Sequence, residues 1–170
     1  MRNGLYILGE LSDEDINWLI YVGTSVALKT GDVLIKEADQ PDSLYILLQG
    51  KLSVRIGKGI EIAVLGKGDI VGEMSIIESR PTSASVVALE ECLLLKLAGS
   101  EITRRFHRDI GFSARFHRAL ALLMAQRIRD TNERLNPDPA LQDPDELGED
   151  ALDVVYQAGT RLDKILHHVQ

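Results

Sequence analysis

The sequence is poor in cysteine, aromatic side chains and long apolar runs. Its single cysteine, Cys92, rules out a disulfide within the chain, and the apolar run Cys92-Leu93-Leu94-Leu95 predicts that this thiol is buried as a small hydrophobic group. No segment approaches the roughly 18 consecutive apolar residues of a membrane span. The first residues, Met1 to Leu5, also lack the apolar stretch of a signal peptide. These absences predict a cytoplasmic protein that does not enter a membrane.

The spacings that indicate catalysis or metal binding are missing as well. His107 and His117 are ten residues apart, and His167 and His168 are adjacent, so none of them forms a His-x-x-x-His or Glu-x-x-His pair. The chain contains neither a Gly-x-Ser-x-Gly elbow nor a P-loop. We therefore expect a protein that is not an enzyme and that carries no metal and no cofactor.

Charge is distributed unevenly within a net charge of −7. Residues 136–170 hold eight acidic and two basic side chains, whereas residues 104–134 hold eight arginines against three acids. Two interpretations are open: the basic and acidic segments contact each other, or each is a solvated face.

Turn residues at close spacing between residues 24 and 98 predict many short strands. Pairs such as Gly31-Asp32, Gly50-Lys51 and Gly68-Asp69 separate apolar runs of four to seven residues. Leu44–Leu48 is continuously apolar and fits a central strand. The pattern predicts a mainly β fold with flanking helices: a compact antiparallel barrel or sandwich, followed by long C-terminal helices.

Helical periodicity flanks these strands. Ser12 followed by acidic residues predicts a helix start, and a short helix from Ser100 is expected to be interrupted at Gly111. A long helix should then cover 112–135, with an apolar stripe formed by Phe112, Phe116, Ala119, Leu120, Leu123 and Ile128. Its length leaves surface for a partner, so we expect a homodimer through helix 112–135, with packing onto its own roll as the alternative.

The chain is thus expected to divide into three parts. Residues 1–135 form the strand-rich domain with its flanking helices, and 149–170 form a last amphipathic helix. Between them, residues 136–148 are acidic and proline-rich and have the composition of a linker.

The most informative segment runs from Gly72 to Ala88. A glycine leaves a strand, an acidic residue and a short helical turn follow, and small hydroxyl residues then enter another strand. Free backbone N–H groups and small side chains, here Ser75, Ser83 and Ala84, allow an anion to approach the backbone. Glu73 would repel a phosphate, but it can accept a hydrogen bond from a hydroxyl such as a ribose 2′-OH.

This segment resembles the phosphate-binding cassette of the cyclic nucleotide-binding domain family, the family of catabolite-activator-like regulators and protein kinase A regulatory subunits. Gly72, Glu73, Met74 and Ser75 match its first part, and Pro81, Ser83, Ala84 and Ser85 match its second part without a gap. Segments 30–37, 43–50 and 68–73 look like neighbouring parts of the same fold.

The resemblance implies that residues 1–135 form an antiparallel, jelly-roll-like β-roll with flanking helices, the long one being the hinge and dimer helix. It also implies a regulatory module for cAMP or cGMP that shifts a helix or a dimer interface when ligand binds. It assigns Glu73 to the ribose 2′-OH. The backbone of Gly72, Ser75, Ser83 and Ala84, together with the Ser83 hydroxyl, would hold the cyclic phosphate. On the long helix, the polar candidates for covering the base are Gln126, Arg127, Thr131 and Asn132.

One position departs from the family pattern. The arginine that pairs with the phosphate falls at Thr82, which supplies neither a charge nor a two-pronged donor. Arg80 is the nearby substitute candidate. The alternative function is therefore a degenerate domain that binds no nucleotide and serves as a dimerising or protein-interaction scaffold.

A DNA-binding output is not expected from residues 136–170. A helix-turn-helix needs two short helices and a basic recognition helix, whereas this segment predicts one acidic helix that would repel phosphates. An output through the acidic helix, docked on or released from the arginine-rich helix, is the remaining hypothesis.

Overall fold

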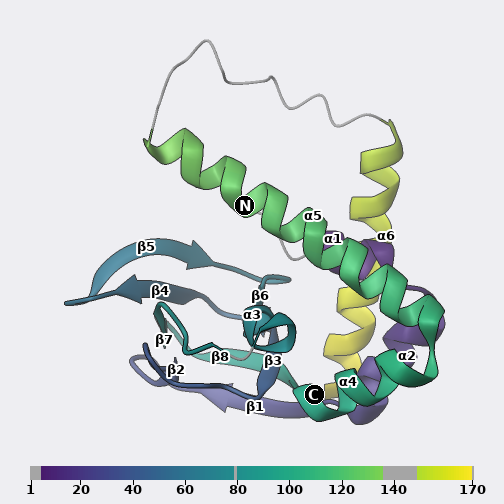
Figure 1. Cartoon of the computed structure of the whole chain (residues 1–170), viewed down its shortest axis with the longest axis horizontal. Helices are drawn as coiled ribbons and strands as arrows, with labels where there is room; N and C mark the ends of the chain where they lie inside the picture. The colour runs from purple at the N-terminus through teal and green to yellow at the C-terminus, as the bar shows by residue number, and fades with distance from the viewer. Residues whose placement is uncertain (1–4, 79, 136–148, 170) are drawn as a thin grey trace.

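The computed structural model describes residues 5–78, 80–135 and 149–169 (Figure 1). Two helices, α1 (Leu5–Glu10) and α2 (Asp13–Val22), open the chain. The strands that follow are β1 (Thr24–Leu28), β2 (Val33–Ile35), β3 (Ser43–Gln49), β4 (Leu52–Ile56), β5 (Ile60–Leu65), β6 (Ile70–Val71), β7 (Ser85–Ala88) and β8 (Cys92–Ala98). The short helix α3 (Glu73–Ile77) lies between β6 and β7, and the chain continues as α4 (Gly99–Arg108), α5 (Ile110–Leu135) and α6 (Glu149–Val169).

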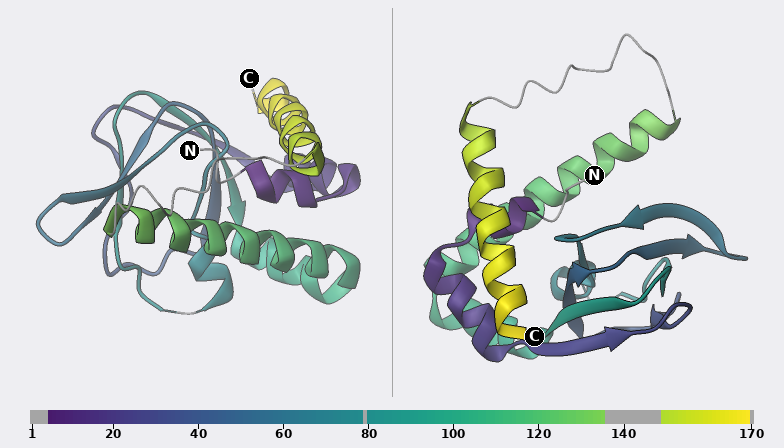
Figure 2. Two further views of the ribbon diagram at one scale, coloured as in Figure 1. Left: turned by 90° about the horizontal axis from the view of Figure 1, so that it is seen from above. Right: turned by 180° about the vertical axis from the view of Figure 1, so that it is seen from behind.

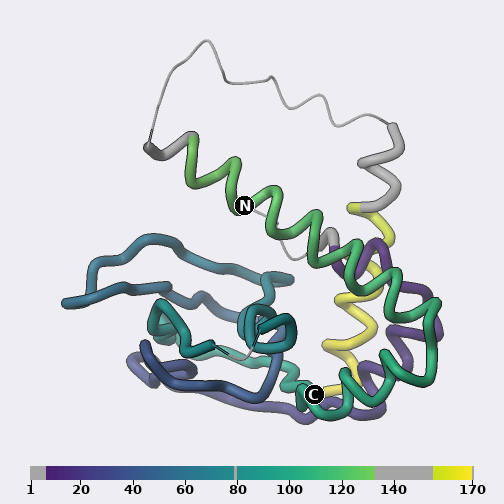
Figure 3. The backbone as a smooth tube through the Cα atoms, in the orientation of Figure 1, coloured from purple at the N-terminus to yellow at the C-terminus, as the bar shows by residue number. Residues whose placement is uncertain are grey.

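The strands form two four-stranded sheets that face each other. One sheet has the order β1-β8-β3-β6 and the other β2-β7-β4-β5, and all neighbouring strands are antiparallel. The tube in Figure 3 shows the two sheets opening toward one end, while the helices gather on the opposite side. The predicted β-roll with flanking helices is confirmed.

Strand β3 is buried on both faces, which explains why its sequence is continuously apolar. Leu47 points into the core between the sheets, together with Ile35 and Leu94. Leu44, Ile46 and Leu48 point the other way, into the core between the first sheet and the helices. A strand covered on both faces needs apolar residues at successive positions rather than alternate ones. Leu44–Leu48 is thus the interior strand that its sequence predicts.

Helix α2 begins directly after Ser12, as predicted, and Ser12 and Asp15 form a complete capping box. The Asp15 amide donates to the Ser12 hydroxyl at 3.2 Å, and the Ser12 amide donates to the Asp15 carboxylate at 2.9 Å. Cys92 is buried, as its apolar neighbours indicate, and burial raises the pKa of its thiol.

The break between α4 and α5 lies at Asp109, not at Gly111 as predicted. Asp109 has an extended backbone, and its carboxylate accepts a hydrogen bond from the Phe112 amide at 2.8 Å. An aspartate in this position caps the start of the next helix, so Gly111 is accommodated inside the first turn of α5. The apolar stripe is correct from Phe112 to Leu123, but Ile128 is 62% exposed because this part of α5 has left the packed core.

Helix α6 lies against the N-terminal helices, as both views of Figure 2 show. Its residues Ala158, Leu162 and Ile165 are buried there. Arg161 donates to the carbonyl oxygens of Leu8 and Gly9 at 2.8 and 3.0 Å, at the end of α1. An apolar stripe, completed by one arginine, therefore attaches this acidic helix to the body of the protein.

The arginine-rich stretch finds its acidic partners elsewhere in the fold. Arg115 pairs with Asp15, Arg118 with Glu10 and Arg127 with Glu73, all of which precede this stretch in the sequence. Among the residues that the structure describes, these ion pairs do not involve α6. The arginines pair with acidic side chains of α1, α2 and α3 instead.

The predicted linker 136–148 lies outside the described residues. Within the described part of the chain, no helix combines the length and the apolar composition that a membrane span needs.

Candidate functional site

A left-handed glycine turns the chain from β6 into α3. Gly72 has φ +86° and precedes the first residue of the helix. A Cβ atom here would lie 2.3 Å from the carbonyl oxygen of Ser43, a backbone atom of β3 that cannot move aside independently. Only glycine satisfies both conditions, and the turn it makes directs Glu73 inward.

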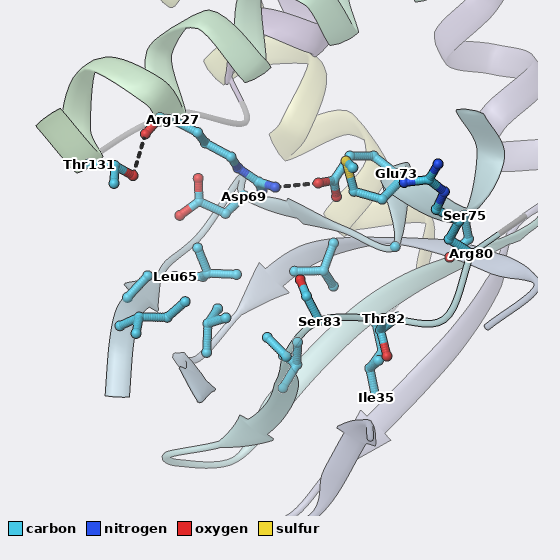
Figure 4. Close-up of a pocket in the computed structure, with 18 of the residues that line it drawn as sticks. Ile35, Leu65, Asp69, Glu73, Ser75, Arg80, Thr82, Ser83, Arg127 and Thr131 are labelled. Carbon is cyan, nitrogen blue, oxygen red and sulfur yellow. Dashed lines mark hydrogen bonds and ion pairs between the residues drawn. The ribbon is translucent and has the colours of Figure 1, made fainter. Parts of the chain in front are cut away.

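A cavity of about 820 Å³ lies between this turn, the second sheet and α5 (Figure 4). Its size is within the range of about 300–1,000 Å³ that is usual for small-molecule sites. All eight residues predicted as ligand contacts border it: Gly72, Glu73, Met74, Ser75, Arg80, Thr82, Ser83 and Ala84. The predicted residues therefore come together around one cavity.

The cavity is crossed by an ion pair between α5 and α3. The Arg127 guanidinium donates through Nη1 to Oε1 of Glu73, whose side chain is only 4% exposed. Through Nη2, Arg127 also donates to the Ile70 carbonyl oxygen at 2.5 Å. Figure 4 shows the arginine extending from α5 to meet the carboxylate of Glu73. The residue predicted to bind a ribose hydroxyl thus already has a charged partner.

Thr82 turns its hydroxyl away from the cavity. Its Oγ1 donates to the Lys36 carbonyl oxygen at 2.8 Å, and its amide donates to the Asp39 carbonyl oxygen at 2.8 Å. Both bonds attach the cassette to the loop between β2 and β3. The Ser83 hydroxyl, in contrast, points toward the Arg127–Glu73 pair (Figure 4). Thr82 is therefore a loop-holding residue here, and Ser83 is the hydroxyl that the cassette presents to the cavity.

Arg80 does not replace the missing family arginine inside the cavity. Its side chain is 80% exposed and its Nε lies 3.5 Å from the Glu78 carboxylate at the rim. Of the four candidates on the long helix, Arg127 and Thr131 line the cavity. Gln126 bonds to Asp130 at 2.9 Å instead, and Asn132 is exposed on the helix.

The structure adds two features that the sequence did not reveal. Asp69 and Asp130 border the cavity, so with Glu73 and Glu78 its described lining has four carboxylates against the two guanidiniums of Arg80 and Arg127. In addition, β4 and β5 supply an apolar wall that includes Val54, Ile62 and Val64. Asp69 belongs to segment 68–73, to which no role in the site was assigned. Asp130 comes from α5, and the pairing of β4 with β5 builds the wall. The cavity can therefore bind a ligand with an apolar body and one or two polar ends.

The loop held by Thr82 contains a strained alanine, which gives a stability prediction. Ala38 has φ +70°, and its amide donates to the Thr82 carbonyl oxygen at 2.9 Å. Because left-handed backbone costs a residue with a Cβ about 1–2 kcal/mol, Ala38→Gly should stabilise the fold by about 0.5–1 kcal/mol after the entropy of glycine is subtracted. Denaturant unfolding measures this. Ala27→Gly, in an exposed strand position, is the control and should lower stability; a loss of stability in both variants contradicts the assignment of strain.

Comparison with known proteins identifies relatives of this chain. Residues 25–109, half of the chain, match the sequence model of the cyclic nucleotide-binding domain. The chain is 32% identical over 110 residues to the Pycsar effector protein XpPycTIR of Xanthomonas perforans, covering 64% of this chain and 36% of that one. It is 34% identical over 90 residues to the cAMP-dependent protein kinase type II regulatory subunit of Drosophila melanogaster, covering 51% and 23%. It thus spans about a third or less of the length of these relatives.

A solved structure gives the same result for the fold. A cyclic nucleotide-binding domain from Methylobacillus flagellatus superposes with a TM-score of 0.72 at 27% identity, covering 79% of this chain and 82% of that one. The sequence match and the similar fold agree, and the chain belongs to the cyclic nucleotide-binding domain family.

Proposed function

We propose that this chain is a regulatory, non-catalytic module that binds a cyclic nucleotide of the cAMP or cGMP type. One observation carries the proposal: the cavity bordered by all eight predicted contact residues also contains a buried carboxylate, Glu73, and is closed on one side by α5. A regulatory module needs a ligand site that touches a movable element, and α5 is that element.

The ligand would bind with its ribose toward Glu73 and its phosphate toward the cassette. Glu73 accepts a hydrogen bond from the ribose 2′-OH. The phosphate lies against the backbone of Gly72, Ser75, Ser83 and Ala84, with the Ser83 hydroxyl as a further donor. The purine then lies along the apolar wall of β4 and β5, under Thr131 of α5. This arrangement places the ribose and the phosphate at polar groups of the cavity and the purine at its apolar wall.

Binding would change the position of α5. In this structure, Arg127 holds α5 to Glu73 and to the Ile70 carbonyl oxygen. A ribose hydroxyl at Glu73 competes with this contact, so the ligand shifts the balance between two positions of the helix. The exposed Ile128 and half-exposed Leu122 on α5 are available for a second copy of the chain, and dimerisation through 112–135 stays a prediction.

Glu73 can be tested with a pair of ligands that differ by one hydroxyl. Because a hydrogen bond to a charged group contributes about 1.5–3 kcal/mol, the protein should bind cAMP roughly 10- to 150-fold more tightly than 2′-deoxy-cAMP. Glu73→Ala should bring this ratio close to one. Isothermal titration calorimetry measures both affinities in each variant.

The ratio of the cAMP and 2′-deoxy-cAMP affinities distinguishes loss of the contact to the ribose hydroxyl from damage to the fold. A distorted cavity weakens both ligands together and leaves their ratio unchanged, whereas loss of the acceptor removes the discrimination itself. Glu90→Ala, at an exposed position outside the cavity, should retain the ratio of the unmodified protein. Discrimination that persists in Glu73→Ala would show that another group reads the ribose.

The second candidate function is a scaffold that binds no nucleotide. It is favoured by Thr82, whose hydroxyl is directed to the Lys36 carbonyl oxygen, and by the excess of carboxylates around the cavity. Absence of heat on titration with cAMP and cGMP at millimolar concentration would support the scaffold and exclude the nucleotide-binding module.

A further inference from the structure

We infer that Arg127 supplies the positive charge for the ligand's phosphate, and that ligand binding exchanges the Arg127–Glu73 pair for two protein–ligand contacts. This inference rests on the proposed function and assigns to α5 a role that the cassette cannot perform. It follows from the cations available in the cavity, from the chemistry of the pair and from the donors that Arg127 has in reserve.

The cations that border the cavity leave one suitable candidate. Within the described lining, the cationic side chains are Arg80 and Arg127. Arg80 is mostly solvent-exposed and pairs with Glu78 at the rim. The Arg127 side chain is 30% exposed and lies across the cavity itself. Thr82 contributes no charge, and its hydroxyl is engaged by the β2–β3 loop.

The two side chains of the Arg127–Glu73 pair are complementary to two polar groups of the ligand, the phosphate and the ribose hydroxyl. Glu73 is an acceptor and Arg127 is a donor, and in this structure each satisfies the other. A ribose hydroxyl donates to the carboxylate, and a phosphate accepts from the guanidinium, so one ligand replaces both halves of the contact. Breaking the pair without this double replacement leaves a buried charge without a partner, which is strongly unfavourable. The site should therefore bind a molecule that carries both the hydroxyl and the phosphate more tightly than one that carries only one of them.

Arg127 has donors left for this exchange. Its bonds to Glu73 and to Ile70 use two of the five N–H groups of a guanidinium. The bond to the Ile70 carbonyl oxygen can hold the side chain inside the cavity while the other nitrogens turn to the phosphate. A two-pronged contact of this kind is the geometry in which arginine binds phosphate best.

The position of the charge has a mechanistic consequence. An arginine at Thr82 would hold the phosphate from the roll alone, independently of the helix. An arginine on α5 ties the phosphate contact to the helix position, so that affinity and helix position are coupled through one side chain.

The test compares cAMP with adenosine, which lacks the phosphate. Arg127→Gln should weaken cAMP binding roughly 10- to 150-fold and leave adenosine binding equal or tighter, because the competition for Glu73 is relieved. Arg127→Lys, which keeps the charge, should recover part of the loss. Thr82→Arg combined with Arg127→Gln should also recover cAMP binding, since it returns a cation to the cassette. Arg129→Gln, at an exposed position of the same helix, is the matched control and should bind like the unmodified protein.

The outcomes separate this inference from the proposed function. If Arg127→Gln binds cAMP as tightly as the unmodified protein, or more tightly, Arg127 is only a competitor for Glu73 and the inference is wrong, while the nucleotide-binding function stands. If cAMP and adenosine weaken equally, the effect is structural and the inference is again wrong. If the unmodified protein binds neither cAMP nor cGMP, the proposed function fails, and the inference fails with it.

Discussion

Asp15→Asn should lower the free energy of unfolding by about 3 kcal/mol, the lower end of the cost of breaking a buried ion pair. Asp15 is fully buried and accepts bonds from two arginines: Arg115 at 2.7 and 3.1 Å, and Arg105 at 3.0 Å. The guanidinium of Arg105 also lies 4.6 and 4.5 Å from the ring centroids of Trp18 and Phe112. One carboxylate thereby holds α2, α4 and α5 together at the α4–α5 break.

Thermal unfolding gives a direct measurement of this loss. For a chain of this size, a loss of about 3 kcal/mol corresponds to a fall in Tm of about 6–12 °C. Glu14→Gln is the neighbouring control, since Glu14 is exposed and its change should stay within about 0.5 kcal/mol. A Tm for Asp15→Asn within the error of the unmodified protein would show that the Asp15 carboxylate does not hold the three helices together.

The same residue predicts how stability depends on pH. Burial alone would raise the pKa of the Asp15 carboxyl, but the hydrogen bonds and the charge of Arg115, with the Ser12 bonds, outweigh it and hold the pKa below its ordinary value of 3.8. A carboxyl whose pKa is lowered in the folded state stabilises the protein above its unfolded pKa, and this contribution is lost as the pH falls through the folded value. The stability difference between the unmodified protein and Asp15→Asn should therefore be full at neutral pH and shrink below about pH 4.

Gly72→Ala should be the most damaging single change at the site. The left-handed backbone costs an alanine about 1–2 kcal/mol, and the contact with the Ser43 carbonyl oxygen adds about 1–3 kcal/mol of overpacking. The combined loss of about 2–5 kcal/mol falls on the turn that places Glu73 in the cavity. We expect lower stability in denaturant unfolding together with loss of cAMP and cGMP binding.

A second glycine separates the cost of the left-handed backbone from the cost of the close contact with Ser43. Gly59 has φ +91°, but a Cβ there would meet open space. Gly59→Ala should therefore lose only the backbone term of about 1–2 kcal/mol and retain ligand binding. Equal losses in the two variants would show that the close approach to Ser43 has no energetic weight.

Much of the fold could be predicted because its signals are local. Turn residues located the strands, Ser12 located a helix start, and the spacing from Gly72 to Ala84 located the cassette. The break at Asp109 was misplaced because glycine is a general helix breaker, whereas this break depends on one hydrogen bond from an aspartate to the Phe112 amide.

The parts of the site that were missed depend on contacts between distant residues. Glu73 and Arg127 are 54 positions apart, and no motif marks the arginine as its partner. The direction of the Thr82 hydroxyl depends on the Lys36 carbonyl, 46 positions away. Sequence reasoning supplied Arg127 only as one of four polar residues on a helix, and chain topology selected it.

The central claim is that the cavity between the cassette and α5 binds a cyclic nucleotide even though threonine occupies position 82. Isothermal titration of the unmodified chain with cAMP and with cGMP tests it most directly. We expect saturable heat with at least one of them, at one ligand per chain, and tighter binding than the corresponding nucleoside. Absence of heat with both ligands at millimolar concentration, from a protein whose thermal unfolding shows that it is folded, would contradict it.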